Sequence, residues 1–363
     1  MTRCKFLALL PIALLCAATA RADGSFSGRD RFDLDRPEIR QFVEATATAQ
    51  KVQPLDVYRL LAKAEPQPRI IELISKPAEK IAPWWQYRER FLTEQRIAEG
   101  TQFMQEHRQR LEKARRETGV APEYVVAIIG VETFYGRITG RYRVLDALAT
   151  LAFDYPPRAA FFKDELAQFI ALTREEKVDP LTAMGSYAGA MGASQFMPSS
   201  YRRYAVDGGD DDQRDLFADW DDIIASVANY FQKNGWVADG PVLADAVLQP
   251  DAPVVADPGN LSLNETVGGL KAKGVDFDPY AQQEDARVLL VPAETPLGPS
   301  YRVGFKNFEV ITRYNRSVRY AMAVHDLAQT IAVRVAAADA TRAGNPTHLA
   351  SRKTAREDDG ITR

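Results

Sequence analysis

Apolar residues recur at helical spacing through most of the chain. Over residues 37–64 they fall every three or four positions, and a proline suits the first turn of each of two helices. The same spacing predicts one long helical segment over 88–117, largely helical structure over 122–231 and a further helix over 308–335. The pattern therefore predicts a mainly helical protein.

The stretch 240–304 breaks this pattern. It is rich in proline and carries short runs of β-type residues, such as Arg287–Val291. We interpret it as a small α+β domain inserted into the helical chain. The boundaries that follow are an N-terminal helical region (23–80), a helical core (81–239), the insertion (240–304), a C-terminal return to the core (305–340) and a disordered polar tail (341–363).

The first 22 residues have the pattern of an export signal. Arg3 and Lys5 precede an apolar run over 6–16 that is too short to span a membrane, and Ala20–Ala22 forms an A-x-A cleavage site. We therefore predict a cleaved signal peptide over 1–22 and a periplasmic protein. A buried N-terminal helix is the alternative.

Both cysteines, Cys4 and Cys16, lie in this segment, so the mature chain has no thiols and no disulfides. A lipoprotein anchored to the outer membrane through Cys16 is an alternative, although Leu15 is bulky for the position before a lipidated cysteine. Removal of the segment also removes three positive charges and changes the net charge from −3 to −6.

Composition excludes several classes of protein. The 363 residues have 46% hydrophobic and 26% charged residues, which is typical of a globular protein of about two domains. A net charge of −3 argues against a nucleic-acid binder, and three histidines with two cysteines leave few ligands for zinc. No stretch has the length of a transmembrane helix, so we predict a soluble exported protein.

One predicted helix, over 122–136, combines an apolar surface with a single charge. Between residues 124 and 135 only Glu132 is charged, and a helix that is apolar on every face is buried. Burial raises the pKa of a carboxyl group, and an acid that stays protonated near neutral pH is what general acid catalysis requires. The alternative is a buried Glu132 paired with Arg137 or Arg141.

A second informative stretch covers residues 185–201. Its glycines at 185, 189 and 192 allow close approach of backbone or ligand, and polar residues alternate with apolar and aromatic ones. Such a mixture is typical of a ligand-binding cleft. Packing of small residues between helices is the alternative.

Together these motifs resemble the membrane-bound lytic murein transglycosylase B family, from about residue 30 to residue 335. The order of the motifs makes the resemblance specific. The segments that carry it are Gly130–Gly136, Ser186–Gly192, Gln195–Tyr201 and Ser226–Phe231, supported by Pro83–Trp84 and Arg313–Asn315.

The resemblance implies a lysozyme-like helical catalytic core of the goose type, with an additional helical domain and a small inserted α+β domain. It implies cleavage, without water, of the β-1,4 bond between N-acetylmuramic acid and N-acetylglucosamine in peptidoglycan. Glu132 would act first as the acid and then as the base that helps close a 1,6-anhydro ring. One acid suffices because the substrate supplies the nucleophiles, whereas ordinary glycosidases use two carboxylates. The sequence agrees, since we find no second acid in a comparably apolar setting.

Two other functions stay open at this point. A muramidase of similar fold would hydrolyse the same bond, and a non-catalytic peptidoglycan-binding protein would act as a scaffold. In each case the partner is the peptidoglycan glycan strand, with other cell-wall enzymes as further candidates, and no cofactor is required for catalysis.

The resemblance also assigns substrate contacts. Ser186 would orient the N-acetyl group, and Arg158 would meet the acidic peptide stem, although Pro157 stands where relatives often have a second arginine. The remaining predicted contacts are Gln195, Tyr230, Tyr314 and Tyr320, with Met191 and Phe134 lining the cleft.

An acidic loop begins at Asp207 and is a candidate site for structural calcium. Calcium needs several oxygen ligands from a tight loop, and the resemblance suggests an EF-hand-like site with a closing aspartate. Two residues argue against such a site: Gly209 has no side chain with which to bind calcium, and Asp212 stands where the loop usually has a glycine. The alternative is a solvated acidic turn. The candidate ligands are Asp207, Asp211, Gln213 and Asp222.

Overall fold

The computed structural model describes residues 31–75, 82–253 and 256–343. The predicted signal peptide, the Cys16 anchor and the tail beyond residue 343 lie outside these residues. Within them no helix is long and apolar enough to cross a membrane.

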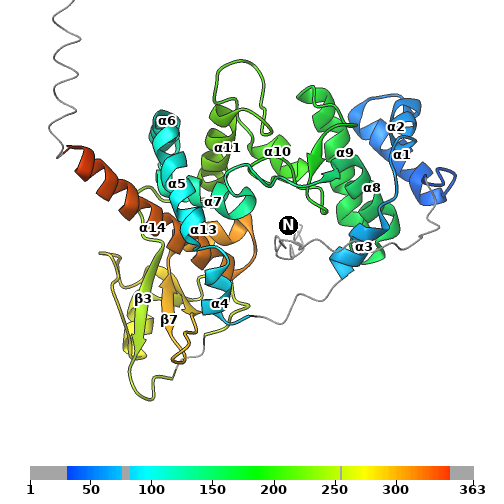
Figure 1. The fold of residues 1–363 in the computed structure, drawn as a ribbon. Coiled ribbons are helices and arrows are strands. Elements are labelled where there is room, and N and C mark those ends of the chain that lie inside the picture. The colour runs from blue at the N-terminus through cyan, green and yellow to red at the C-terminus, as the bar shows by residue number, and fades with distance from the viewer. Residues whose placement is uncertain (1–30, 76–81, 254–255, 344–363) are drawn as a thin grey trace, which may run out of the picture.

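Helices make up most of the described chain, as the apolar spacing predicts (Figure 1). They are α1 (Pro37–Gln50), α2 (Pro54–Leu61), α3 (Pro68–Ser75), α4 (Trp84–Glu89), α5 (Glu94–Glu106), α6 (Arg108–Thr118), α7 (Pro122–Thr133), α8 (Val144–Asp154), α9 (Ala159–Glu175), α10 (Pro198–Tyr204), α11 (Trp220–Lys233), α12 (Val267–Ala272), α13 (Lys306–Tyr314) and α14 (Val318–Ala343), with a short 3-10 helix at Pro156–Arg158.

Helix α7 lies at the centre of the helical core. Every residue of α7 except Glu123 is buried, as expected for a helix that is apolar on all faces. Helices α5, α6, α11 and α14 pack against it, and Figure 1 shows α7 next to α5 and α13. The rest of the core is therefore built around the helix that carries Glu132.

The N-terminal helices pack against the middle of the chain. Helix α3 contacts α8, and α1 contacts α9, while α8 and α9 pack closely on each other. Side chains from α1 to α14 join in one continuous apolar core. The region predicted over 23–80 therefore shares its packing with the core instead of standing apart.

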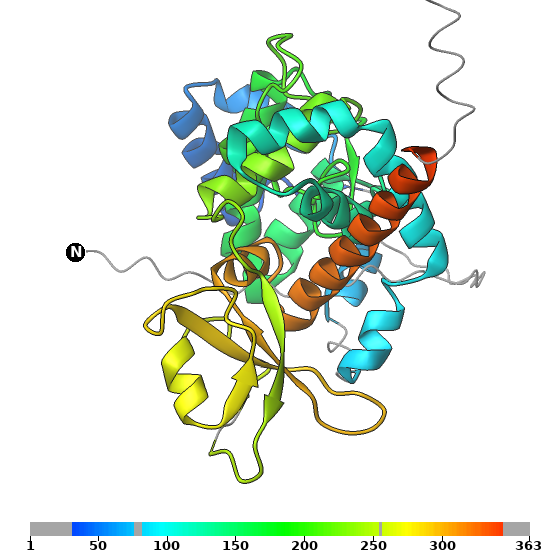
Figure 2. The same ribbon diagram turned by 90° about the vertical axis from the view of Figure 1, so that its left-hand side faces the viewer.

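The stretch 240–304 folds as a small α+β unit, as predicted. Its five strands form an antiparallel sheet in the order β4-β6-β7-β3-β5, and it has an apolar core of its own together with α12. Figures 1 and 2 show this sheet at one end of the molecule. The strands are β3 (Leu243–Leu248), β4 (Glu265–Thr266), β5 (Val275–Phe277), β6 (Arg287–Pro292) and β7 (Tyr301–Gly304). A separate two-stranded pair joins β1 (Tyr142–Arg143) to β2 (Met184–Gly185).

A buried carboxylate ties the small sheet to α14. The Asp326 carboxylate on α14 accepts a hydrogen bond of 2.7 Å from Arg88, in the last turn of α4. It accepts a second hydrogen bond, also of 2.7 Å, from Arg302 on β7. Arg302 also pairs at 3.0 Å with the exposed Asp245 of β3. Charge-assisted bonds to a buried group are stronger than neutral ones, so this cluster fixes the position of α14 against its neighbours.

The prediction of one helix over 88–117 is wrong. The Thr93 side chain accepts a bond of 3.2 Å from the backbone N–H of Arg96 and so starts α5 as an N-cap. A second break falls at His107, whose backbone leaves the helical region between α5 and α6. The apolar spacing continues across these residues, but the N-cap at Thr93 and the break at His107 divide the segment into separate helices.

Two further boundaries differ from the prediction. The segment 308–335 is divided by a break at 315–317, where the Ser317 hydroxyl accepts the backbone N–H of Tyr320 at the start of α14. Helix α14 continues to Ala343, so residues 341–343 are helical and do not belong to a disordered tail.

Candidate active site

Glu132 lies in the last turn of α7, and its side chain is almost completely enclosed, with 7% of the residue exposed. The Tyr320 hydroxyl on α14 donates a hydrogen bond of 2.6 Å to Glu132 Oε1. Burial raises the pKa of the Glu132 carboxyl to about 7, while the bond from Tyr320 acts in the opposite direction. The group can therefore hold and release a proton near neutral pH.

Neither of the nearby arginines pairs with Glu132. Arg137 forms an ion pair with Glu99 and lies over the ring of Phe134, while Arg141 lies over Tyr142. The alternative of a buried Glu132–arginine pair is thus not what the structure contains. This matters because an adjacent guanidinium would lower the pKa of the carboxyl and keep it ionised.

The chain turns sharply directly after the glutamate. Helix α7 ends at Thr133, and Phe134 and Tyr135 both adopt left-handed backbone conformations (φ 53° and 59°), so the helix does not run on to Gly136 as predicted. The Tyr135 ring fills space left by Gly130, where an added Cβ would lie 2.6 Å from the tyrosine hydroxyl. Left-handed non-glycine residues are costly and persist where packing over-determines them.

Three tyrosines surround the carboxyl group: Tyr87, Tyr314 and Tyr320. Burial raises the pKa of Tyr87 to about 12, and the charge of Glu132 adds to that rise. Burial also raises the pKa values of Tyr314 and Tyr320, again with a contribution from Glu132. All three phenols are thus neutral near pH 7, and Tyr320 can donate its proton in a hydrogen bond.

Tyr87 was missed by the sequence analysis. It follows Pro83–Trp84, which supported the family resemblance, but no periodicity connects α4 with α7. Tyr314, in contrast, was predicted as a substrate contact, and its hydroxyl donates a hydrogen bond of 2.7 Å to the carbonyl of Ser194. Tyr320 was predicted as a sugar contact, whereas its hydroxyl is bonded to Glu132.

The loop from 185 to 197 presents two of the predicted contacts. The Ser186 hydroxyl accepts the backbone N–H groups of Ala188 and Ala190 at 3.3 and 3.0 Å, which leaves its own hydrogen free to donate. The loop is linked to α7 because the Thr133 hydroxyl donates a hydrogen bond of 2.9 Å to the Ala193 carbonyl. Ser186 is therefore held in a fixed turn.

Gln195 is held in a left-handed conformation (φ 52°) at the end of this loop. Its amide nitrogen donates to the carbonyls of Thr139 and Gly192 at 2.9 and 3.1 Å. Its buried Oε1 has no protein partner in the described chain, and neither does the buried Oδ1 of Asn315. Buried acceptors without partners are costly unless a ligand satisfies them.

The remaining predicted substrate contacts, Met191, Tyr230 and Phe134, have contacts within the protein. Met191 is fully buried, so it packs beneath the loop and does not line an open surface. The Tyr230 hydroxyl donates 2.7 Å to the Arg313 carbonyl, and the ring packs on Tyr314. The partly buried ring of Phe134 has guanidinium groups within about 5 Å, with Arg96 at 4.6 Å.

Arg158 follows the second proline of the short 3-10 helix. Its guanidinium stacks on Phe161 and Phe162, with 4.4 and 5.0 Å to the ring centroids. Its buried Nε has no hydrogen-bond partner in the described part of the chain. Burial lowers its pKa, yet an arginine remains charged at any physiological pH.

Other acids are buried as well as Glu132, but they do not lie in a comparably apolar setting. Asp146 binds Arg143, Asp326 binds two arginines, and Glu165 accepts both the hydroxyl and the backbone N–H of Ser199. These three carboxylates have strong donors, whereas among the described residues the one donor to the Glu132 side chain is the Tyr320 hydroxyl. The apolar setting of Glu132 is what distinguishes it.

The acidic loop does not gather its predicted ligands. Both carboxylate oxygens of Asp222 accept backbone N–H groups, from Gly208 at 2.7 Å and Asp215 at 2.5 Å, and Asp207 accepts those of Asp211 and Asp212. Within the described ranges no group of three or more His, Cys, Asp or Glu side chains could hold a metal ion. The predicted residues therefore do not fit a calcium site.

A cation from α6 contacts this loop instead. Lys113 donates a hydrogen bond of 2.8 Å to the Gly208 carbonyl and lies 3.3 Å from Asp210. Arg110, also on α6, pairs at 2.9 Å with Asp221 in the first turn of α11.

Comparison with known proteins gives one consistent result. The family described as the transglycosylase SLT domain matches residues 35–329. Membrane-bound lytic murein transglycosylase B of Escherichia coli is 38% identical over 311 residues, which covers 82% of this chain and 84% of that protein.

Solved structures agree in fold. Lytic transglycosylase SltB1 of Pseudomonas aeruginosa is 43% identical with a TM-score of 0.79, over 82% of this chain and 98% of that one. Escherichia coli Slt35 in complex with calcium is 37% identical (TM-score 0.76; 84% and 96% covered). Pseudomonas aeruginosa SltB3 in complex with NAG-anhNAM-pentapeptide is 29% identical (TM-score 0.71; 80% and 78% covered).

The raised pKa of Glu132 predicts a pH-dependent stability. As pH rises from about 4.5 to about 7, the unfolded chain loses the Glu132 proton while the folded chain keeps it, so the free energy of unfolding falls. We expect Glu132→Gln to remove up to about 3 kcal/mol of this fall. Urea unfolding of both proteins at several pH values measures the difference, with Glu117→Gln on the exposed end of α6 as a control. Parallel curves for the unmodified chain and Glu132→Gln would contradict the raised pKa.

Proposed function

The chain belongs to the transglycosylase SLT domain family and is a peptidoglycan lytic transglycosylase, and we propose that Glu132 is the single acid that carries its reaction. The observation that supports this role most strongly is a buried carboxyl with a pKa of about 7 that has no cationic partner among residues 31–75, 82–253 and 256–343. A glycosidic oxygen needs a proton as its bond breaks, and a group that titrates near neutral pH can both give and take one.

The proposed reaction has two proton transfers through the same carboxyl. Glu132 donates its proton to the glycosidic oxygen between N-acetylmuramic acid and N-acetylglucosamine as the C1–O bond breaks. The neighbouring N-acetyl carbonyl oxygen bonds to C1 and stabilises the positive charge. The ionised Glu132 then takes the proton of the C6 hydroxyl as that oxygen attacks C1 and displaces the acetyl oxygen. The product is a 1,6-anhydro ring, and the acid is regenerated without water.

Other residues are proposed to orient the sugar. The free hydrogen of the Ser186 hydroxyl suits the N-acetyl carbonyl oxygen, since both of its acceptor contacts are already made to backbone N–H groups. The unsatisfied oxygens of Gln195 and Asn315 suit sugar hydroxyl or amide donors. Tyr320 keeps the Glu132 carboxyl in one orientation and stabilises its ionised form in the second step.

The stacked guanidinium of Arg158 is proposed to meet a carboxylate of the peptide stem. Its Nε is buried without a partner, and stacking on two rings holds the planar group in place. SltB3 was solved in complex with a pentapeptide-bearing ligand, so a relative binds glycan that carries a stem.

Hydrolysis is the nearest rival. A muramidase would place a water molecule where the C6 hydroxyl attacks, and its product would be one water heavier. The names of the relatives, together with the anhydro sugar in the SltB3 complex, favour the anhydro product here. A scaffold without activity would have no need to bury an unpaired carboxyl.

We place the protein in the periplasm on the strength of its predicted signal peptide. The name of the E. coli relative is that of a membrane-bound enzyme, which keeps anchoring through Cys16 as the alternative. The intact mass of the mature chain distinguishes an N-terminus at Asp23 from a lipidated Cys16.

Replacement of the proposed acid tests the mechanism. We expect Glu132→Gln to lower the release of anhydromuropeptides from purified peptidoglycan by at least about a thousandfold, because one group performs both proton transfers. Mass spectrometry of the soluble products measures this, and binding to sedimented peptidoglycan should be retained. Glu117→Gln serves as the exposed control. Anhydro products at an unchanged rate from Glu132→Gln would exclude Glu132 as the acid, and products one water heavier from the unmodified chain would establish hydrolysis.

Calcium has no part in the proposed reaction. Slt35 was solved with calcium, but the acidic loop of this chain is held by backbone N–H groups and by Lys113. We therefore expect EDTA to leave the melting temperature unchanged, and added calcium to raise it no more than magnesium does. Lys113→Met should lower the melting temperature whether or not calcium is present. A fall in EDTA that calcium alone reverses would show that the loop binds calcium.

A further inference from the structure

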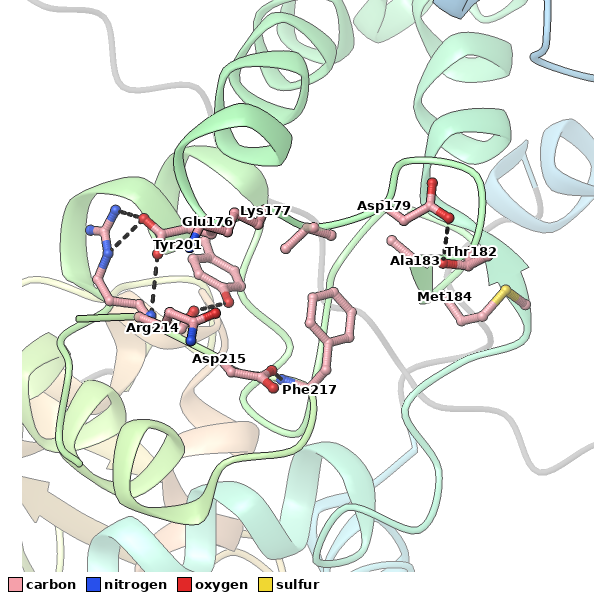
Figure 3. Close-up of a pocket in the computed structure, with 12 residues that line it drawn as sticks. Glu176, Lys177, Asp179, Thr182, Ala183, Met184, Tyr201, Arg214, Asp215 and Phe217 are labelled. Carbon is pink, nitrogen blue, oxygen red and sulfur yellow. Dashed lines mark hydrogen bonds and ion pairs between the residues drawn. The ribbon is translucent and has the colours of Figure 1, made fainter. Parts of the chain in front are cut away.

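A cavity of about 470 Å³ lies apart from Glu132, between the segment that follows α9 and the end of the acidic loop (Figure 3). This volume is within the range of small-molecule sites. Its lining combines charged, polar and apolar side chains. They are Glu176, Lys177, Val178, Asp179, Thr182, Ala183, Met184, Tyr201, Gln213, Arg214, Asp215 and Phe217.

One side of the cavity is fixed by internal bonds. The Tyr201 hydroxyl donates to the Arg214 carbonyl and accepts the Leu216 N–H at 2.9 Å. The Arg214 guanidinium pairs with Glu176, so these two charges cancel each other. Figure 3 shows this group on one side of the Phe217 ring and Asp179, Thr182 and Met184 on the other.

The remaining charges of the lining have no ionic partners. In the described chain the Lys177 ammonium makes no hydrogen bond or ion pair. Asp179 accepts the Leu181 N–H at 2.9 Å and the Thr182 hydroxyl at 3.1 Å, and Asp215 accepts two backbone N–H groups through Oδ1, but neither contacts a cation. The cavity thus offers one unpaired positive and two unpaired negative side chains.

Lys177 is also held in a left-handed conformation (φ 55°), which an L residue adopts at a cost. The lining also contains apolar side chains, namely the partly buried Phe217 and Val178, and Met184, which is 41% exposed. A ligand that matched this lining would have ionic groups of both signs joined by an apolar chain.

The charges of the lining favour one class of ligand. A phosphate or a nucleotide would meet two carboxylates and one cation, a net repulsive set. A neutral sugar would gain no ionic contact, and water would continue to hydrate the exposed Lys177 and Asp179. A small zwitterion with an aliphatic part matches charges of both signs and can contact the apolar side chains.

We propose that this cavity binds an uncross-linked peptide stem of peptidoglycan, whose diamino acid has a free amine and free carboxylates. Its ammonium group would contact Asp179 and Asp215, a carboxylate would contact Lys177, and the aliphatic chain would lie on Phe217. This assignment rests on the proposed function, since it takes peptidoglycan to be the substrate.

The position of the cavity in the chain suits this role. Met184, which lines it, is two residues from Ser186, a span of about 7 Å for extended chain. The Leu216 carbonyl, next to Phe217, accepts the Ala193 N–H of the loop that carries Gln195. A stem carried by a glycan strand at Ser186 and Gln195 is thus close to the cavity, and the site would favour strands whose stems are not cross-linked.

Isothermal titration calorimetry on the full chain tests the proposal. The probe is the tripeptide L-alanyl-γ-D-glutamyl-meso-diaminopimelate, compared with the same peptide acetylated on its side-chain amine. We expect the free peptide to bind, and acetylation or Lys177→Met to weaken binding by about tenfold or more, because each removes a charge-assisted contact. Phe217→Ala should weaken it as well. Lys271→Met, on α12 in the small domain, is the matched control and should bind as the unmodified chain does.

Three outcomes would overturn the proposal: no binding of the free peptide, equal binding of the acetylated peptide, or binding that Lys177→Met leaves unchanged while Arg158→Ala abolishes it. The modified peptide keeps the test valid even if a variant folds poorly. Release of anhydro products from peptide-free glycan strands, unchanged in Lys177→Met, separates this site from the reaction. Absence of anhydro products when the unmodified chain digests stem-bearing peptidoglycan would instead contradict the proposed function.

Discussion

One carboxyl group is buried at the end of an apolar helix, and the chemistry of the site follows from that burial. Helix α7 is apolar on every face, so it has to occupy the interior, and Glu132 is buried with it. An ionised carboxylate is costly in such surroundings, and its proton is retained up to a pH of about 7. The chemistry proposed for the enzyme is a direct consequence of this cost.

The rest of the fold keeps that carboxyl in one place. Helix α14 brings Tyr320 to within 2.6 Å of Glu132, and the bonds of Asp326 to Arg88 and Arg302 tie α14 to α4 and to the small sheet. On the other side, the left-handed turn after Thr133 is held by the packing of Tyr135 into the space beside Gly130. Contacts from distant parts of the chain therefore orient the two carboxylate oxygens of Glu132.

The sequence predicted the parts of the site that depend on local pattern. The buried α7 and the small α+β insertion follow from apolar periodicity and proline content, and the family resemblance supplied Ser186 and Gln195. The contact between Tyr320 and Glu132 joins residues 188 apart, and no spacing rule reaches that far. Met191 was misplaced because an apolar residue in a loop has no periodicity to show which side it faces. The helix breaks at Thr93 and His107 were missed because capping is decided by single polar contacts.

The ionisation of Glu132 itself is the most direct test of this account. A protein labelled with ¹³C at the glutamate side-chain carboxyl carbons, with the Glu132 signal assigned by its loss in Glu132→Gln, allows the chemical shift to be followed against pH by NMR. We expect a midpoint near pH 7, well above the ordinary value of 4.5, because the carboxyl is buried. A midpoint at or below 4.5 would show that the carboxyl is ionised at neutral pH, and it would contradict the central role given to burial.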